Sequence, residues 1–550
     1  MKTRLALLLF LALSACRSTG GAPLRFEGYG GYARTVTTTS RAAQELFDQG
    51  IQLLYGFNHD EATRSFQAAA EADPSCAMAW WGIAYANGRD INNPDVTEAE
   101  ARLAYDAAQE AQRHLAGATP VEAALVRAIL LRYALPNPAD RRPLDEAYAR
   151  AMESVYREFP DDPDVGAIYA ESLMNLQPWD LWERDGTPKG RTLEIVAVLE
   201  HVLAIAPLHP GANHFYIHTV EASSDPDRAV AAADRLRDLV PGAGHLVHMP
   251  SHIYTRVGRY ADAAEANVRA IAADKRYFAV APPPDFYNIY FVHNVHFLAY
   301  ASMMEGRYEA AMSAASELEE SVPPDFLVNW VQYADGLMTT PWHVLVRFGE
   351  WEQVLAEPPP EDFRKLARAL WHYARGVSLS ALGRTDEARH ELEAFETAAA
   401  LVPESWTVGN NSSGQVLALA RQMLRGELLY REGELDQAFA ALREGVRLED
   451  ELVYDEPPGW MQPIRHALGA LLLGAGRAAE AEEVYRADLE KNRANGWSLL
   501  GLEQALCAQG RDEEAAPVRL AREAAFSRSD VAPSSSCYCQ PGPTDPLASR

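Results

Sequence analysis

The sequence predicts an all-α fold in which antiparallel helix pairs stack side by side into a superhelical solenoid. Apolar residues recur at spacings of three and four through almost the whole chain, and no convincing alternating strand pattern interrupts them. A short glycine-centred turn phrase also returns along the sequence. A chain of 550 residues is too long for one ordinary core, so an extended array of repeats is expected.

The recurring turn phrase is the evidence for helix pairs. It reads VGRYADAA at 257–264, EGRYEAAM at 305–312, LGRTDEAR at 382–389, EGELDQAF at 432–439, AGRAAEAE at 475–482 and QGRDEEAA at 509–516. Glycine readily takes the positive φ that ends a helix, which explains why it stands at the same place in every copy. The glycine intervals 349 to 383 and 476 to 510 are both 34 residues long, so we predict a helix–turn–helix unit of that length.

The first unit carries the fullest pattern, in the segment LFDQGIQLLYGFNHDEATRSFQAAAEADP at residues 46–74. Its small and apolar positions are Leu46, Gly50 and Leu53 on the first helix, Ala62, Phe66 and Ala69 on the second, and Pro74 at the end. This pattern resembles the tetratricopeptide repeat (TPR) family, and the resemblance covers most of residues 40–525. It implies a superhelix whose concave groove binds a peptide, a protein or a small molecule.

The N-terminus is typical of a targeting segment rather than of the fold. Lys2 and Arg4 give it a positive start, and the apolar run at 5–13 is too short to span a bilayer. The following LSAC resembles the lipobox of a bacterial lipoprotein, which implies cleavage before Cys16 and lipidation of the Cys16 thiol. That resemblance predicts a protein held by lipid to a membrane of the bacterial cell envelope, on its periplasmic or outer side. An ordinary secretory signal is the alternative.

Composition divides the chain into four parts. The expected parts are a signal peptide at 1–16, a flexible tether at 17–38, the solenoid at 39–525 with a histidine-rich centre at 201–300, and a disordered tail at 526–550. Within the tail, Cys537 and Cys539 leave three interpretations open, which are a disulfide, a weak metal site, or no role at all.

The chain is acidic, with 77 acidic against 50 basic residues and a formal net charge of −27. Such a chain repels phosphate backbones and no basic cluster offsets the repulsion, so nucleic acid is not expected as a partner. The sequence also contains no Walker loop, no dinucleotide fingerprint, no GxSxG elbow and no CxxC pair. Because these motifs are absent, the histidines are the main candidates for a functional site.

Histidine is concentrated in the centre of the chain, where nine of the 15 fall between residues 201 and 296. The stretch NHFYIHTVEAS places His214, His218 and Glu221 on one face of a helix. HLVHMPSHIY at 245–254 and VHNVHF at 292–297 add His245, His248, His252, His293 and His296.

These histidines follow the repeat. His214 and His248 are 34 residues apart, as are His218 and His252. His245 and His293 each stand 13 residues before the next turn glycine. His248 and His296 each stand 10 residues before the same glycines. In the TPR family the first helix of each pair lines the groove, so the resemblance implies that these rings point inward together.

Inward-facing imidazoles on neighbouring helices predict a site for a transition metal such as zinc, copper or iron. Packed helices lie about 8–10 Å apart, so side chains from two of them can meet at one ion. Glu221 would then be a ligand, an orienter of a ligand or a general base. Two other interpretations stay open, namely a polar groove for a small molecule and histidines that only pack. Pro250 affects the geometry, because a helix that starts there would leave His245 and His248 in the preceding loop.

Two classes of function follow from this sequence. The first is a binding or scaffold lipoprotein whose groove also carries the metal site. The second is a metal-dependent enzyme, a hydrolase or an oxidoreductase, that uses the same histidines with Glu221 as its catalytic base. The TPR resemblance favours the first, since arrays of this family serve mainly as binding scaffolds.

Overall fold

The computed structural model describes residues 24–281 and 287–540. The predicted signal peptide with Cys16, the beginning of the predicted tether and residues 541–550 lie outside these ranges. Within them almost all the regular secondary structure is helical, and the helices follow one another as antiparallel pairs, which confirms the prediction of an all-α solenoid. The strands in these ranges, β1 (Thr407–Val408) and β2 (Asn411–Ser412), form one small antiparallel hairpin.

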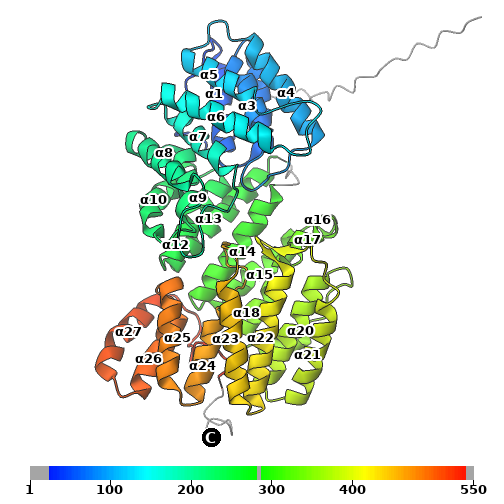
Figure 1. Cartoon of the computed structure of the whole chain (residues 1–550), viewed down its shortest axis with the longest axis vertical. Coiled ribbons are helices and arrows are strands. Elements are labelled where there is room, and N and C mark those ends of the chain that lie inside the picture. The colour runs from blue at the N-terminus through cyan, green and yellow to red at the C-terminus, as the bar shows by residue number, and fades with distance from the viewer. Residues whose placement is uncertain (1–23, 282–286, 541–550) are drawn as a thin grey trace, which may run out of the picture.

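Two lobes lie one above the other, as Figure 1 shows. The N-terminal lobe consists of α1 (Arg41–Tyr55), α2 (His59–Ala72), α3 (Ala77–Ala86), α4 (Glu98–Arg113), α5 (Pro120–Ile129), α6 (Arg142–Glu158), α7 (Pro163–Met174), α8 (Thr192–Ile205), α9 (Pro210–Val220), η1 (Pro226–Ala229), α10 (Val230–Leu239), α11 (Gly244–His248), α12 (Pro250–Arg256) and α13 (Tyr260–Phe278). The helices α14 (Asn288–Met304) and α15 (Tyr308–Ser321) connect it to the C-terminal lobe.

The C-terminal lobe continues the pairing with its own core. Its helices are α16 (Pro324–Asn329), α17 (Val331–Ala334), η2 (Leu337–Thr339), α18 (Thr340–Phe348), α19 (Trp351–Ala356), α20 (Lys365–Ala381), α21 (Thr385–Ala399), α22 (Ser413–Arg431), α23 (Leu435–Asp450), α24 (Ile464–Gly474), α25 (Ala478–Lys491), α26 (Gly496–Ala508) and α27 (Asp512–Ala525). One large cluster of buried apolar side chains fills the N-terminal lobe and a second fills this one. Among the described residues, no helix is both long and apolar enough to cross a bilayer.

The turn glycines behave as their repetition predicts. Gly258, Gly306, Gly349, Gly383, Gly433, Gly476 and Gly510 all have a φ between 72° and 83°. An L-residue with a side chain rarely takes this conformation, so glycine is what allows each helix to end and the next to begin antiparallel to it.

The described part of the predicted tether is packed against the N-terminal lobe rather than flexible. The Arg34 guanidinium donates to Asp164 Oδ2 at 2.7 Å and to Asp162 Oδ1 at 2.8 Å. Thr37 Oγ1 donates to Glu122 Oε2 at 2.6 Å. For residues 24–38 the expectation of a tether is therefore wrong, because specific ion pairs and hydrogen bonds fix a segment whose composition alone suggests disorder.

The described part of the predicted disordered tail is also ordered. After α27 the chain returns into the C-terminal lobe, where Ser536 is fully buried. Ser536 Oγ donates to the His466 carbonyl at 2.8 Å, and the Tyr538 ring lies against Gly349. Residues 526–540 thus belong to the fold, and the expectation of disorder is wrong for them.

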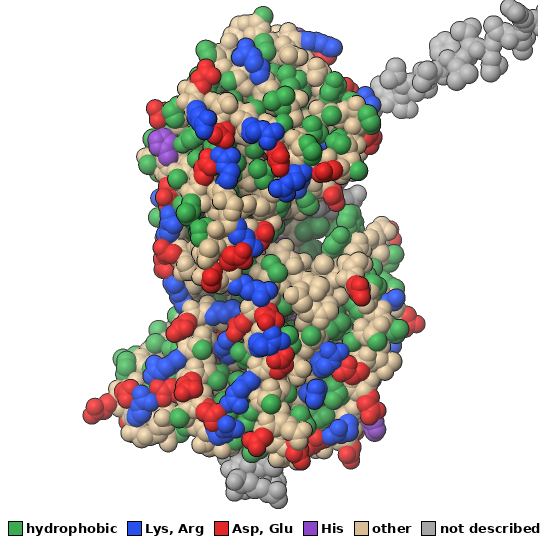
Figure 2. All heavy atoms as spheres, viewed as in Figure 1, with side chains coloured by type: hydrophobic (Ala, Val, Ile, Leu, Met, Phe, Trp, Pro, Cys, Tyr) green, Lys and Arg blue, Asp and Glu red, His purple; other side chains and the backbone are tan. Residues whose placement is uncertain are grey.

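The surface carries charges of both signs. Figure 2 shows acidic and basic side chains interspersed over both lobes on the face in view, and a recess between the lobes. The described histidines of the central region, by contrast, are mostly inside the protein.

Candidate metal centre

The predicted histidines of α9, α11, α12 and α14 meet as two groups of three, and His218 and His252 also form an overlapping group with Glu221. Triad 1 is His214, His218 and His245, and triad 2 is His248, His252 and His293. In each triad, ring nitrogens from all three residues lie within 4.8 Å of one another. All of these residues except His293 are buried.

Local sequence places these helices. His209 caps α9 by accepting from Ala212 N, and Pro210 supplies the fixed φ of the first turn. His214 and His218 then follow one turn apart. Pro250 starts α12, while Met249 before it keeps helical dihedral angles, so α11 and α12 form one interrupted helix rather than a loop and a helix. His245 and His248 are therefore helical, and the interruption separates His245 from His252.

The triads obey one construction rule. Each takes two histidines four residues apart on one helix and a third from the first helix of the next unit, 13 residues before its turn glycine. Triad 2 is thus the copy of triad 1 one unit further along the array. The sequence showed which histidines occupy equivalent positions in the repeat. It did not show that the third ligand comes from the next unit, because that depends on how the helices pack.

Among the described residues His296 belongs to neither triad, so its prediction as a ligand from the repeat register is wrong. By the same rule its companions would be residues 300 and 336, which are Tyr300 and Gly336. His296 instead lies near His343. Its pKa is lowered to about 4, mainly by burial and to a smaller extent by repulsion from His343. It is a buried, neutral histidine outside the candidate site.

The carboxylate of Glu221 connects the two triads. Its Oε1 accepts from His218 Nδ1 at 2.9 Å and its Oε2 from His252 Nδ1 at 2.5 Å. Burial alone would raise the pKa of Glu221, but the two imidazoles overcome it and lower that pKa to about 2. With both oxygens engaged, Glu221 is placed to orient one histidine of each triad, which fits an orienter better than a free general base.

Two further acceptors fix histidine tautomers. His214 Nδ1 donates to the Tyr55 carbonyl at 2.7 Å, and His248 Nδ1 donates to Asn267 Oδ1 at 2.7 Å. Asn267 is oriented in turn by its own amide, which donates to the Ala263 carbonyl at 2.8 Å. A neutral imidazole that donates from Nδ1 presents a lone pair at Nε2, the form that binds metals.

The Nε2 atoms face one another. The distances between Nε2 atoms are 3.1 Å for His214 and His245, 2.8 Å for His248 and His252, and 3.0 Å for His248 and His293. Two nitrogens bound to one tetrahedral zinc at 2.0–2.1 Å would lie about 3.3 Å apart. These three pairs are therefore close to the spacing of two ligands on one ion, and the remaining nitrogen of each triad lies within 4.8 Å of the others.

Burial keeps the imidazoles neutral. It lowers the pKa of His214, His245, His248 and His293 well below 6.5, and repulsion from neighbouring histidines lowers it further. The His252 pKa is also lowered by burial, against the opposing effect of Glu221. Neutral imidazole is the form required of a metal ligand, since protonation removes the lone pair.

Aromatic rings enclose the triads. Phe57 lies 4.6 Å from the His214 ring and 5.4 Å from the His245 ring, and Trp179 lies 5.3 Å from His218, between ring centroids. Phe57 and Trp179 have φ values of 55° and 61°, unusual for side-chain-bearing residues. Strained backbone of this kind persists where the surrounding structure enforces it, often at functional sites. No local sequence pattern marks either residue as part of the site.

Two openings border this enclosure. A narrow cleft is lined by Trp179, His218 and Glu221 on one side and by Tyr454 of the C-terminal lobe on the other. A larger cavity of about 290 Å³ lies behind Phe57. It brings together Asn58 and His59 with the polar loop around Asp90 and Asn93, two segments that the sequence places apart.

The lobes meet beside Glu221. The Arg256 guanidinium donates to the Glu221 carbonyl and lies 5.4 Å from the centre of the Tyr454 ring. The Tyr454 hydroxyl donates to Glu456 Oε1 at 2.6 Å. Burial raises the pKa of Glu456 to about 8, although Tyr454 and Arg256 lower it in part. Glu456 is thus mostly a neutral acid at pH 7.

Replacing Glu456 with glutamine is expected to stabilise the protein increasingly as pH rises from 5 to 8. In the wild type the folded acid holds a proton that the unfolded chain releases near pH 4.3, so wild-type stability falls across this range. Each pH unit contributes about 1.4 kcal/mol at most, and glutamine, which cannot ionise, escapes this loss. Urea unfolding of both proteins at several pH values measures the difference. A difference independent of pH would contradict the raised pKa.

Comparison with known proteins adds little. No family model matches the chain, and no curated protein matches its sequence. Solved structures that resemble it include the human IFIT1 dimer with m7Gppp-AAAA, at 11% identity over 90% of this chain and 92% of that chain with a TM-score of 0.32. Another is the APC/C hetero-tetramer Cut9-Hcn1, at 13% identity over 90% and 79% with a TM-score of 0.30. Similarity this low says nothing about function, and the fold assignment rests on the helices themselves.

Proposed function

We propose that this protein is a helical-repeat binding scaffold that holds two transition-metal ions, one in each histidine triad. The contact between His248 and His252 carries the proposal. Asn267 and Glu221 accept hydrogen bonds from the Nδ1–H groups of these residues, so both Nε2 atoms present lone pairs 2.8 Å apart. Two lone pairs at that distance repel inside a buried site, and a cation bound by both would turn the repulsion into attraction.

The ligand set indicates the class of metal. Three imidazoles per ion suit zinc, copper or iron, the metals that the sequence suggests. The carboxylate of Glu221 contributes the negative charge next to both triads, and it orients His218 and His252 as an outer-shell partner typically does. Calcium or magnesium would require oxygen ligands that the triads do not offer.

A catalytic role is the second candidate, and one observation favours it. Three protein ligands leave a fourth position open, as in catalytic rather than structural zinc sites. The narrow cleft at His218 has room for about one water molecule beside triad 1, and the larger cavity lies on the other side of Phe57. A hydrolase or an oxidoreductase is compatible with this arrangement, with the triads binding the metal and Glu221 holding the ligands in place.

The open position can be tested separately from metal binding. We expect azide to change the visible absorption of the protein loaded with cobalt(II), because an exogenous anion can enter an open coordination site. A spectrum unchanged by azide would indicate a closed structural site and exclude the catalytic candidate.

The remaining parts of the proposal concern partners and location. The groove of the solenoid would bind a peptide, a protein or a small molecule, and lipidation of Cys16 would hold the chain at a membrane of the bacterial envelope. Cys16 lies outside the described residues, so mass determination of the mature protein expressed in a bacterium is the direct measurement. An unlipidated N-terminus would leave the ordinary secretory signal as the explanation of residues 1–16.

Elemental analysis tests the proposal directly. After chelation and reloading with zinc, copper or iron, the chain is expected to bind about two ions. Glu221→Gln is expected to weaken binding at both triads by roughly 10- to 100-fold, because Glu221 orients one histidine in each. Glu200→Gln is a matched control, since Glu200 contacts Tyr216 and Arg228 on the surface rather than a triad histidine. Less than about 0.2 ion per chain after reloading would overturn the proposal.

A further inference from the structure

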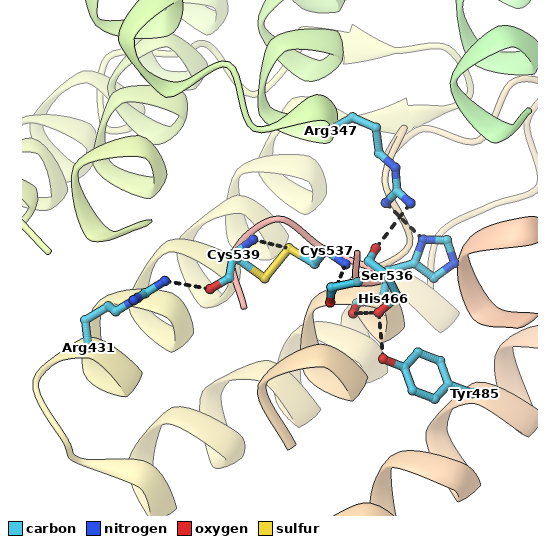
Figure 3. The surroundings of a disulfide bond; sticks show 8 residues. Arg347, Arg431, His466, Tyr485, Ser536, Cys537 and Cys539 are labelled. Atoms are coloured by element: carbon cyan, nitrogen blue, oxygen red, sulfur yellow. Dashed lines mark hydrogen bonds between the residues drawn. A yellow bond between two sulfur atoms is a disulfide. The ribbon is translucent and has the colours of Figure 1, made fainter. Parts of the chain in front are cut away.

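We propose that Cys537, Cys539 and Glu427 form a site for thiol–disulfide exchange in the C-terminal lobe, separate from the histidine triads. Figure 3 shows the pair of cysteines joined by a disulfide where the tail returns into the lobe. Glu427 belongs to α22, about 110 residues earlier in the chain. The inference does not depend on metal binding by the triads.

The fold holds the cysteine pair in a defined place. Arg431 Nη2 donates to the Cys539 carbonyl at 2.7 Å, and Arg347 Nη2 donates to the Ser536 carbonyl at 3.2 Å (Figure 3). Tyr485 and Ser536 share a hydrogen bond of 2.6 Å between their hydroxyls. The disulfide is thus presented by an ordered segment rather than by a mobile end.

Glu427 is the observation that points to chemistry. A carboxylate oxygen of Glu427 and the two sulfur atoms all lie within 4.8 Å of one another. The side chain is buried, with 3% of its surface exposed, and its Oε1 has no hydrogen-bond partner. Burial raises the pKa of Glu427 to about 8, so at neutral pH it is mostly a carboxylic acid with a proton to donate.

The two sulfurs differ in their surroundings. Cys537 is half-buried, whereas Cys539 is buried. The backbone N–H of Cys539 donates to Cys537 Sγ at 3.2 Å, a contact that would stabilise negative charge on that sulfur. Cys537 is the more exposed of the two sulfurs, so an incoming thiolate would attack it, and the buried Cys539 would be the first leaving group. The N–H contact would stabilise Cys537 later, when the second step releases it as a thiolate.

The exchange requires a dithiol as reductant. Its thiolate attacks Cys537 Sγ and forms a mixed disulfide, the bond between the two protein sulfurs breaks, and Cys539 leaves with the electron pair. Glu427 gives its proton to the Cys539 thiolate. The second thiol of the reductant then attacks the mixed disulfide and releases Cys537 as a thiolate, which takes up a proton. Two electrons pass from the dithiol, which becomes a disulfide, to the protein, which gains two thiols, and Glu427 recovers its proton from solvent.

The rate of reduction tests this assignment. The folded full-length protein is treated with dithiothreitol, the new thiols are trapped with N-ethylmaleimide, and the tryptic peptide that begins at Ser529 is quantified by mass spectrometry. At pH 7 we expect Glu427→Gln to be reduced about tenfold more slowly than the wild type, because the leaving thiolate lacks its acid. The ratio of the two rates should approach one above pH 8, where the Glu427 carboxyl loses its proton.

Two further variants separate catalysis from structure. Glu427→Asp keeps a carboxylic acid and should recover part of the rate. Glu449→Gln is the matched control and should react like the wild type. Glu449 is a largely buried acid, with 11% of its side chain exposed, and burial raises its pKa to about 7, but it lies outside the cysteine group. A disulfide that dithiothreitol fails to reduce in the folded protein would overturn the assignment. The assignment would also be overturned if the ratio of the wild-type rate to the Glu427→Gln rate did not change with pH.

Discussion

Replacing His252 with alanine is expected to remove one of two metal ions from each chain. His252 belongs to triad 2 and not to triad 1, so triad 1 should still bind its ion, although His252 also lies close to His218 through Glu221. The loss in affinity at triad 2 should exceed the roughly 10- to 100-fold that substitution of an outer-shell partner costs, because a direct ligand is lost. His218→Ala should remove the ion of triad 1 in the same way, and the double variant should bind neither. Elemental analysis after dialysis against a metal buffer counts the ions.

His296→Ala is the matched control for these variants. His296 is a buried histidine on α14, one turn from His293, but it belongs to neither triad. Its replacement should leave the count of ions unchanged. Equal loss from His296→Ala and His252→Ala would mean that metal binding responds to damage in the core rather than to particular ligands.

Replacing Asp164 with alanine is expected to destabilise the N-terminal lobe by about 3–5 kcal/mol, the cost of removing one partner from a buried ion pair. Asp164 accepts from the Arg34 guanidinium at 2.7 Å and from the Tyr55 hydroxyl at 2.5 Å, and it lies 3.2 Å from His209 Nε2. Without it, Arg34 retains only Asp162, and two buried polar groups lose their acceptor. Urea unfolding of the metal-free protein measures the loss.

The neighbouring Asp161 provides the control for this experiment. Its side chain is 84% exposed, so Asp161→Ala should change stability by no more than about 0.5 kcal/mol. Asp164→Ala should also weaken metal binding at triad 1, since Tyr55 provides the carbonyl that orients His214. A cost for Asp164→Ala no larger than that for Asp161→Ala would show that residues 24–38 do not depend on this ion pair.

Features that depend on local conformation could be predicted from the sequence. The positive φ of Gly258 and Gly306 follows from the requirements of a tight turn, which any chain must meet. The equivalence of His214 with His248 followed from counting along the repeat. What counting could not show is that the third ligand of each triad comes from the next unit, because that depends on how the helices pack.

Features that depend on distant contacts could not be predicted. Composition suggested a flexible segment around Arg34, yet its partner Asp164 lies 130 residues away. Phe57 and Trp179 enclose His218 from separate connections between helices, and neither belongs to a recognisable motif. His296 was grouped with the ligands because it shares their register, but register identifies equivalent positions and not whether neighbouring positions complete a triad.

Each triad takes its third histidine from the following repeat unit, so adding units would extend the series of triads. The number of ions should grow with the length of the array, since each added unit with the same three positions would create one more complete coordination set. Under the proposed function this chain has two complete coordination sets, because Tyr300 and Gly336 occupy the next positions. Gly336 could not simply be replaced, since a Cβ there would lie 2.7 Å from Val408 Cγ2. Under the proposed function, the contact between Gly336 and Val408 of β1 would therefore limit how many ions the array can hold.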